Sequence, residues 1–241
     1  MIRQLFFGDT ENDRNLPQMS NLQLLISNKM CRDVHKEIQL SRNDIDYKDL
    51  TGNTALHWVV VYGKTDVVQM LLSYGADPKC FNFADLTPLH DAAMWDHKSI
   101  PLLLEAETDP DIRNYNGVSP LHCAARQRHW QPGLYMSPLL DAGANINAQT
   151  KRGATPLTLA CGEYKNFAAV AYLIQQGADI NLPSHEGNTP IVIAIQWQNS
   201  SYVQLLMEAG AECCGVDVFG DNILHQVAMW GDIEIMQVLN K

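Results

Sequence analysis

One four-residue phrase recurs along the chain at a nearly constant interval. Its copies are Thr54-Ala-Leu-His57, Thr87-Pro-Leu-His90, Ser119-Pro-Leu-His122, Thr155-Pro-Leu-Thr158, Thr189-Pro-Ile-Val192 and Asn222-Ile-Leu-His225. These copies begin 33, 32, 36, 34 and 33 residues apart. A period in this range indicates stacked structural repeats, in which each unit buries its apolar face against its neighbours. The phrase is therefore interpreted as a structural element and not as a catalytic motif.

Each copy of the phrase predicts the start of a helix. The Ser, Thr or Asn at the N-cap can accept from the free amides of the first turn. Proline suits the first helical position, where its missing N–H costs nothing. The His takes the place of the Glu or Gln of a capping box and is expected to reach back towards the cap. Thr158 and Val192 replace this His in two copies, which leaves the polar link in doubt there without breaking the helix.

The whole unit resembles an ankyrin repeat. After T-P-L-H come a small A-A pair, a second helix ending in L-L, and G-A-D before the next turn. The match is close from Thr54 to Asp77 and from Thr189 to Glu212, and the resemblance covers residues 42–241. Glycine stands two residues before the phrase in five copies, at Gly52, Gly117, Gly153, Gly187 and Gly220. The resemblance implies an all-α solenoid of helix-turn-helix units joined by hairpin loops.

The repeat pattern predicts one domain with an N-terminal cap and six units. Residues 1–17 are polar and are expected to form a flexible lead-in. The cap is placed at 18–50, and the units near 51–84, 85–116, 117–152, 153–186, 187–219 and 220–241. The apolar outer helix expected from Asp232 to Asn240 slightly favours a chain cut from a longer protein over a natural cap at Lys241.

Two units depart from the pattern. Asp85 replaces the glycine before the phrase, so we expect a turn of different shape, because Asp tolerates positive φ less readily than Gly. The third unit carries three extra residues in the region Arg126 to Pro138. Pro132-Gly133 is a turn signal, and Pro138 fits only the first turn of a helix, so a short or irregular outer helix is expected. The insertion is either a tolerated surface loop or a binding loop.

Composition and motifs argue against several functions. The net charge of −10 argues against general nucleic-acid binding, and no apolar run approaches a membrane span. Six cysteines without C-x-x-C spacing predict reduced thiols in the cytoplasm or nucleus. Tyr62-Gly-Lys-Thr65 resembles the end of a phosphate-binding loop, but Trp58 occupies the place of its first glycine. We therefore expect no enzymatic activity, no cofactor and no metal.

A partner surface is expected on the concave face. The resemblance implies that the inner helices and hairpin tips line this face, and that the positions four and five after the His of T-P-L-H, or after the residue that replaces it, point outward there. These positions include Tyr62, Met94, Trp95, Gln127, Trp197, Met229 and Trp230. Tyr, Trp and Met are enriched at interaction hot spots. The alternative is that the rings pack between repeats.

A basic cluster is expected at the centre of the same face. Its members are Arg113, Arg126, Arg128, Lys151 and Arg152, while Trp130, Phe81, Phe83 and Tyr115 extend the apolar contact. A basic spot with apolar ends suits an acidic segment with hydrophobic anchors; simple solvated charges are the alternative. The sequence thus predicts a non-catalytic module that binds a protein or peptide. The competing hypothesis is a regulatory or targeting segment of a larger enzyme, channel or microbial effector.

Overall fold

The described helices form a ladder of pairs. The computed structural model describes residues 45–128, 131–212, 225, 227 and 233–239. The helices are α4 (Ala55–Val61), α5 (Thr65–Ser73), α6 (Pro88–Trp95), α7 (Ser99–Glu105), α8 (Pro120–Arg126), α9 (Gly133–Asp141), α10 (Pro156–Cys161), α11 (Phe167–Gln175), α12 (Pro190–Gln196), α13 (Ser200–Glu208) and α15 (Ile233–Leu239). Every regular element in this part of the chain is a helix. The lead-in at 1–17, the cap helices, Trp130, Met229, Trp230 and the question of Lys241 lie outside the described residues.

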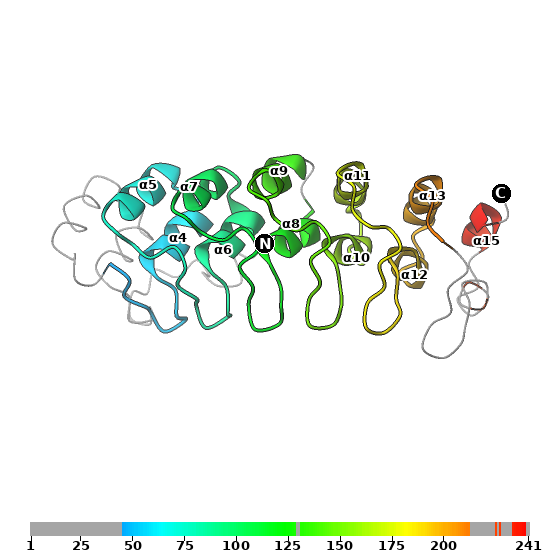
Figure 1. The fold of residues 1–241 in the computed structure, drawn as a ribbon, viewed down its shortest axis with the longest axis horizontal. Helices are drawn as coiled ribbons and strands as arrows, with labels where there is room; N and C mark the ends of the chain where they lie inside the picture. Colours follow the sequence, from blue (N-terminus) through cyan, green and yellow to red (C-terminus); the bar gives the residue numbers. More distant parts are fainter. Residues whose placement is uncertain (1–44, 129–130, 213–224, 226, 228–232, 240–241) are drawn as a thin grey trace, which may run out of the picture.

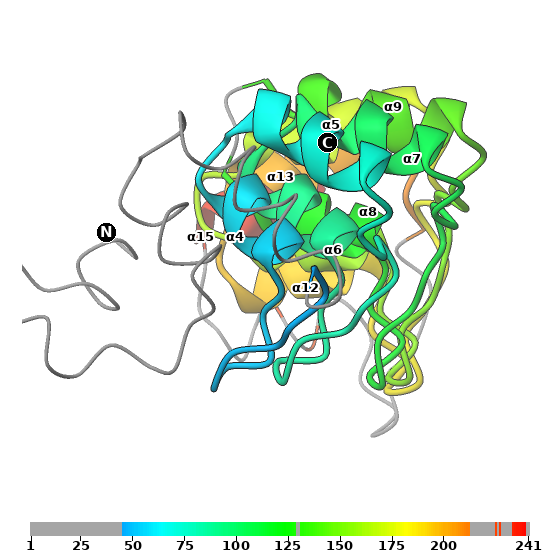
Figure 2. The same cartoon turned by 90° about the vertical axis from the view of Figure 1, so that its left-hand side faces the viewer.

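Two layers of helices and one row of loops make up the stack. The inner helices α4, α6, α8, α10 and α12 lie in one layer and the outer helices α5, α7, α9, α11 and α13 in the other (Figure 1). Long loops project from the inner layer, and a view along the stack shows them on one side of the helices (Figure 2). Among the described residues, consecutive inner helices pack on one another from α4 to α12. The all-α solenoid expected from the sequence is confirmed.

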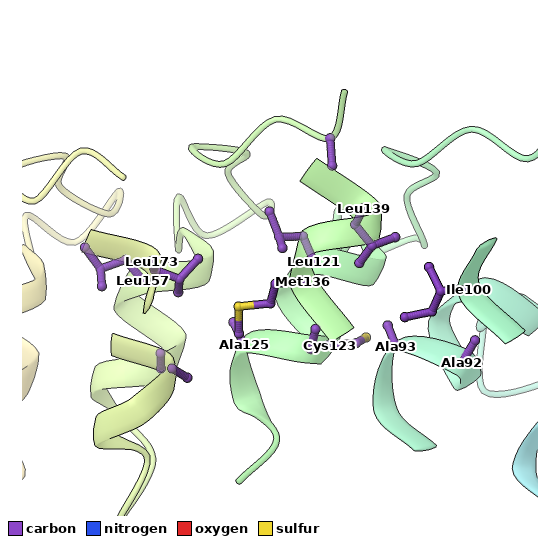
Figure 3. Close-up of a cluster of buried hydrophobic side chains, with 14 of the residues drawn as sticks. Ala92, Ala93, Ile100, Leu121, Cys123, Ala125, Met136, Leu139, Leu157 and Leu173 are labelled. Carbon is purple, nitrogen blue, oxygen red and sulfur yellow. The ribbon is translucent and has the colours of Figure 1, made fainter. Parts of the chain in front are cut away.

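The core is a band between the two layers and not a central cluster. The leucines of the phrase, Leu56, Leu89, Leu121 and Leu157, are buried at equivalent places along this band. In Figure 3, Leu139 of α9 lies above Leu121 of α8 and Met136 of α9 lies above Ala125 of α8, with Ile100 and Ala93 of the preceding pair beside them. The small alanines let neighbouring helices approach closely, so each unit contributes part of its neighbour's core.

The phrase begins the inner helices as predicted. The His57 Nδ1 accepts from the Thr54 N–H at 3.1 Å, and its Nε2 lies 3.1 Å from the Leu86 carbonyl in the next loop. Because Nδ1 is an acceptor, the proton sits on Nε2, which donates to that carbonyl. His90 and His122 repeat both contacts, to Val118 and Ala154. Each histidine therefore closes its own capping box and ties its unit to the next.

The polar link survives without histidine in one unit and not in another. The Thr155 N–H donates to the Thr158 hydroxyl at 2.7 Å, and the Thr158 N–H donates to Thr155 Oγ1 at 3.1 Å. Thr158 therefore completes the capping box in place of histidine, because a hydroxyl group both accepts and donates hydrogen bonds. At Val192 the side chain has no polar atom, and α12 begins after Thr189 without a side-chain cap bond.

The expected change of turn shape at Asp85 does not occur. Asp85 has φ +61, close to the +76 of Gly52 and the +75 of Gly117. Its N–H donates to the Asn82 carbonyl at 3.0 Å, as the N–H of Gly117 donates to Asn114 at 2.8 Å. The prediction was wrong because Asp is one of the few residues that enter the left-handed region with local hydrogen bonds. Here the Asp85 carboxylate accepts from the N–H of Tyr115.

The third outer helix is also regular, against expectation. Helix α9 has nine residues, as many as α5 and α11, and Pro138 lies inside it. The insertion instead lengthens the α8–α9 connection, residues 127–132. An interior proline removes one helical hydrogen bond. The helix persists because Met136 and Leu139 are fully buried, and packing of the apolar face supplies most helical stability in proteins.

Candidate partner-binding groove

A groove of ≈ 1000 Å³ crosses the middle of the inner face. It runs from the loops at 106–119 and 142–155 over α6, α8 and α10 to the α8–α9 connection. The lining residues are Met94, Trp95, Asn116, Val118, Cys123, Arg126, Gln127, Arg128, Tyr135, Thr150, Lys151, Arg152, Ala154, Leu159 and Glu163. It therefore joins three units and is not the property of one repeat.

Seven of the residues singled out from the sequence line this groove. They are Met94, Trp95, Arg126, Gln127, Arg128, Lys151 and Arg152. Trp95 keeps 41% of its surface exposed, which is unusual for a ring of this size. The end of α6 supplies the apolar wall, the end of α8 and its connection supply two arginines, and the fourth loop supplies Lys151 and Arg152.

Other candidates lie elsewhere on the same side of the stack. Tyr62 is half-buried and stacks on Trp58 with ring centroids 5.8 Å apart. Trp197 is 65% exposed at the end of α12 and is absent from the groove lining, although its indole lies over Gly162. Arg113 turns away and donates through Nη1 to the Gln149 carbonyl at 2.8 Å.

The aromatic residues of the loop tips form a separate row. Phe83 is exposed, and its ring and amide lie against Gly52 of the preceding loop. Tyr115 is equally exposed and carries the Lys151 ammonium 3.5 Å from its ring centroid, a cation–π contact. Phe81 is half-buried, and its carbonyl accepts from Lys48 Nζ at 2.8 Å.

Two important groove residues were not selected from the sequence. Glu163 occupies the fifth place after Thr158, so the repeat register also points to this position. Tyr135 comes from outer helix α9, where the insertion shifts the register, and no sequence signal identified it. Its ring lies edge-on to His97 at 5.2 Å. Burial, and then the nearby Asp96 carboxylate, raise the pKa of its phenol.

The groove is basic although the protein is acidic. Arg126, Arg128, Lys151 and Arg152 line it together with a single acid, Glu163, whereas the whole chain has a net charge of −10. The Arg126 Nε lies 3.2 Å from Glu163 Oε1. Clustered cations of one sign create a local potential that attracts anionic groups.

The groove floor is apolar, and titratable groups on it and in the buried core are held neutral. Burial raises the pKa of the Cys123 thiol to about 12, with a further contribution from the neighbouring Asp91. Burial also raises the pKa of the Asp91 carboxyl to about 8 and lowers the pKa of His122 to about 4. Cys123 is therefore a packing thiol and not a nucleophile at neutral pH. The groups that carry charge at neutral pH are therefore the side chains on the rim of the groove.

A buried network fixes the backbone beneath the arginine and the glutamate. Asn166 Nδ2 donates to the Ala125 carbonyl at 2.7 Å, next to Arg126. The Tyr202 hydroxyl donates to the Glu163 carbonyl at 3.1 Å and accepts from the Asn166 N–H. Side chains from the fourth and fifth units thus hold the third and fourth units in place at the groove.

The described part of the chain contains neither a metal-binding cluster nor a membrane-spanning helix. Among the described residues, no three His, Cys, Asp or Glu side chains are grouped so as to hold a metal ion. None of the described helices is both long and apolar enough to cross a bilayer. The arrangement is suited to binding: an apolar wall, a basic rim and a rigid floor.

Comparison with known families decides the class of protein. A family model described as ankyrin repeats (3 copies) matches residues 22–114 and 135–217, and one described as ankyrin repeat matches residues 116–151. The chain belongs to the ankyrin repeat family. Ankyrin repeats are in general protein-interaction modules and are typically non-catalytic.

Two curated relatives share shorter stretches with this ankyrin array. BCL-6 corepressor-like protein 1 of Homo sapiens is 37% identical over 68 residues, which is 28% of this chain and 4% of that protein. Notch-regulated ankyrin repeat-containing protein B of Danio rerio is 40% identical over 53 residues, 22% of this chain and 48% of that protein. The matched stretches therefore cover less than half the length of either relative.

Proposed function

We propose that the protein binds an acidic protein segment with an apolar anchor in the central groove. The observation that carries this proposal is the placement of four basic side chains around Met94, Trp95 and Tyr135 in a chain of net charge −10. A basic site on an acidic surface selects partners by charge complementarity. The general role of ankyrin repeats in protein interaction supports the same proposal.

Affinity and selectivity come from different parts of the groove. An apolar side chain buried against Trp95 and Met94 contributes about 1.5–3 kcal/mol by transfer from water. The rim cations speed encounter and fix the register, with a smaller effect on affinity, because exposed charge pairs are screened. The segment thus needs both an anchor and flanking acids.

A longer partner reaches the surrounding aromatics. Trp197 lies beyond Glu163 along the stack, and Phe83 and Tyr115 lie on the tips of the loops. Exposed aromatics of this size are typical of interaction surfaces. Trp130, Met229 and Trp230 stay predictions from the sequence, as does any binding role for Tyr62, Phe81 and Arg113.

The same proposal covers activity and compartment. We further propose that the protein has no catalysis of its own and binds neither nucleic acid nor cofactor; the net charge of −10 opposes binding to phosphate backbones. Cys80, Cys123 and Cys161 are free thiols, which favours a reducing compartment, the cytoplasm or nucleus. Burial raises the pKa of all three thiols, which keeps them protonated and unreactive.

The test is an array of twelve-residue peptides that vary acidic and aromatic content independently. We expect binding only where two acids flank an aromatic or aliphatic residue, with loss of at least about tenfold for Trp95→Ala. Tyr47→Ala is the matched control, because Tyr47 is an exposed aromatic two loops away from the groove. Equal binding of acidic and neutral peptides, with no effect of Trp95→Ala in a folded variant, would overturn the proposal.

A second candidate function is favoured by one observation. The stretch shared with the human relative is 4% of that protein's length, so this array type also occurs inside much larger proteins. The alternative is that the array is the regulatory or targeting part of a larger enzyme, channel or microbial effector. Sequencing the whole transcript, upstream of the Met1 codon and downstream of the Lys241 codon, decides between them: a further domain in frame on either side supports the alternative, and stop codons that bound the array on both sides contradict it.

A further inference from the structure

Glu163 is out of place in the chemistry of the groove. It is the one acid among the described residues that line a surface carrying four cations. Its carboxylate does not point into solvent but lies against Arg126, with Oε1 3.2 Å from Nε. The Arg126 contact joins the third unit to the fourth, because the two partners are 37 positions apart in the sequence.

The pair is accessible and easily broken. The side chain of Arg126 is 59% exposed and that of Glu163 is 26% exposed. Ion pairs this open to water stabilise a protein by little, because solvent screens them and both side chains lose freedom. A stronger anion therefore displaces Glu163 without unfolding any element.

The backbones beneath the pair are held by hydrogen bonds that do not involve the pair itself. The Glu163 carbonyl is held by the Tyr202 hydroxyl, and the Ala125 carbonyl by Asn166. Opening the pair requires only rotation of two side chains. The guanidinium of Arg126 then remains at the groove, and the hydrogen bonds to the backbone beneath it stay in place.

We propose that Glu163 is an internal competitor for the partner's acidic side chain. In the free protein its carboxylate occupies Arg126, and an acidic residue of the bound segment takes its place. This inference rests on the proposed function of the groove. Its consequence is selectivity. A neutral apolar segment has no carboxylate to replace Glu163 on Arg126, whereas a segment with correctly placed acids forms that ion pair itself and also contacts the other cations of the groove.

The experiment uses a fluorescently labelled twelve-residue peptide with two glutamates flanking a tryptophan and no basic residue. Dissociation constants are measured by fluorescence anisotropy at fixed salt. Glu163→Gln removes the charge and keeps the shape, and we expect it to tighten binding about three- to tenfold. Glu186→Gln is the matched control, since it changes net charge equally on the exposed tip of the next loop, and we expect less than a twofold effect.

A double-mutant cycle separates competition from a general field effect. In the Arg126→Ala background the gain from Glu163→Gln should vanish, because there is no guanidinium left to compete for. Unchanged or weaker binding by Glu163→Gln, or a gain that persists without Arg126, would overturn the inference. Binding that is indifferent to Trp95→Ala and Arg152→Ala would instead overturn the proposed function, and with it the inference.

Discussion

The side-chain amide of Asn166 donates a 2.7 Å hydrogen bond to the carbonyl of Ala125, 41 residues earlier. Ala125 lies in the last turn of α8, where carbonyls have no helical partner. Gln127 follows in an extended conformation, with ψ +140, so the insertion turns the chain away before this carbonyl is satisfied. The next unit thus supplies the bond that the irregular unit lacks.

Replacing Asn166 should destabilise the array more than replacing an ordinary N-cap. Asn166→Ala leaves the Ala125 carbonyl buried without a donor, at a cost of about 2 kcal/mol. Asn199→Ala, at the equivalent place one unit later, removes only an acceptor for the Tyr202 N–H at 3.3 Å and should cost about 1 kcal/mol. Urea unfolding measures both. Equal losses would show that the bond between units is not special.

Close packing between loops should make two glycines respond differently to alanine. Gly153 has φ +77, and a Cβ there would stand 2.5 Å from the backbone nitrogen of His185. Gly143 has φ +94 with nothing within 4 Å of such a Cβ. We expect Gly143→Ala to cost about 1 kcal/mol from backbone strain alone, and Gly153→Ala about 2–4 kcal/mol. Similar costs would contradict the loop packing described above.

The buried histidines should make the protein sensitive to acid. Burial is the main reason that the pKa values of His57 and His122 fall from 6.5 to about 4. The unfolded chain therefore binds protons first, and stability present above pH 6.5 is lost as pH falls towards 4, by about 1.4 kcal/mol per pH unit for each group. His122→Thr, which copies the Thr155–Thr158 box, should flatten this loss in urea titrations between pH 4.5 and 7.5. An unchanged slope in His122→Thr would contradict the assignment.

Asp91 should have the opposite effect on the pH profile. Burial raises its pKa from 3.8 to about 8, so the folded state holds a proton that the unfolded state releases. Its contribution is fully present below pH 4 and is lost as pH rises to about 8. Asp91→Asn should therefore be more stable than the wild type at pH 9 by about 2–4 kcal/mol, with no gain at pH 4. A gain of equal size at both pH values would rule out ionisation as the cause.

The fold followed from the sequence because its signals are local. The Thr87 N-cap, the following proline and His90 specify a helix start by chemistry within four residues. The two wrong expectations both concern tertiary context. Asp85 adopts the glycine conformation with its carboxylate bound by the Tyr115 amide, and Pro138 stays helical because α9 is packed on both sides of it.

The groove was only partly predictable. The repeat register placed Trp95, Arg126 and Gln127 on the inner face because equivalent positions share one orientation. It placed Tyr62 there as well, but Trp58 in the same helix stacks on that ring, a contact that depends on side-chain size and not on register. Tyr135 escaped notice because it reaches the groove from an outer helix.

Charge reversal at Arg152 tests the central claim most directly. The dissociation constants of an acidic peptide with a tryptophan anchor, and of the same peptide with its glutamates changed to lysines, are measured against the wild type and Arg152→Glu. If the groove recognises acidic segments, Arg152→Glu weakens the acidic peptide about tenfold or more and strengthens the lysine peptide by a comparable factor. If both peptides bind the folded variant as they bind the wild type, the groove does not distinguish peptides by charge, and the proposal that it binds acidic segments is wrong.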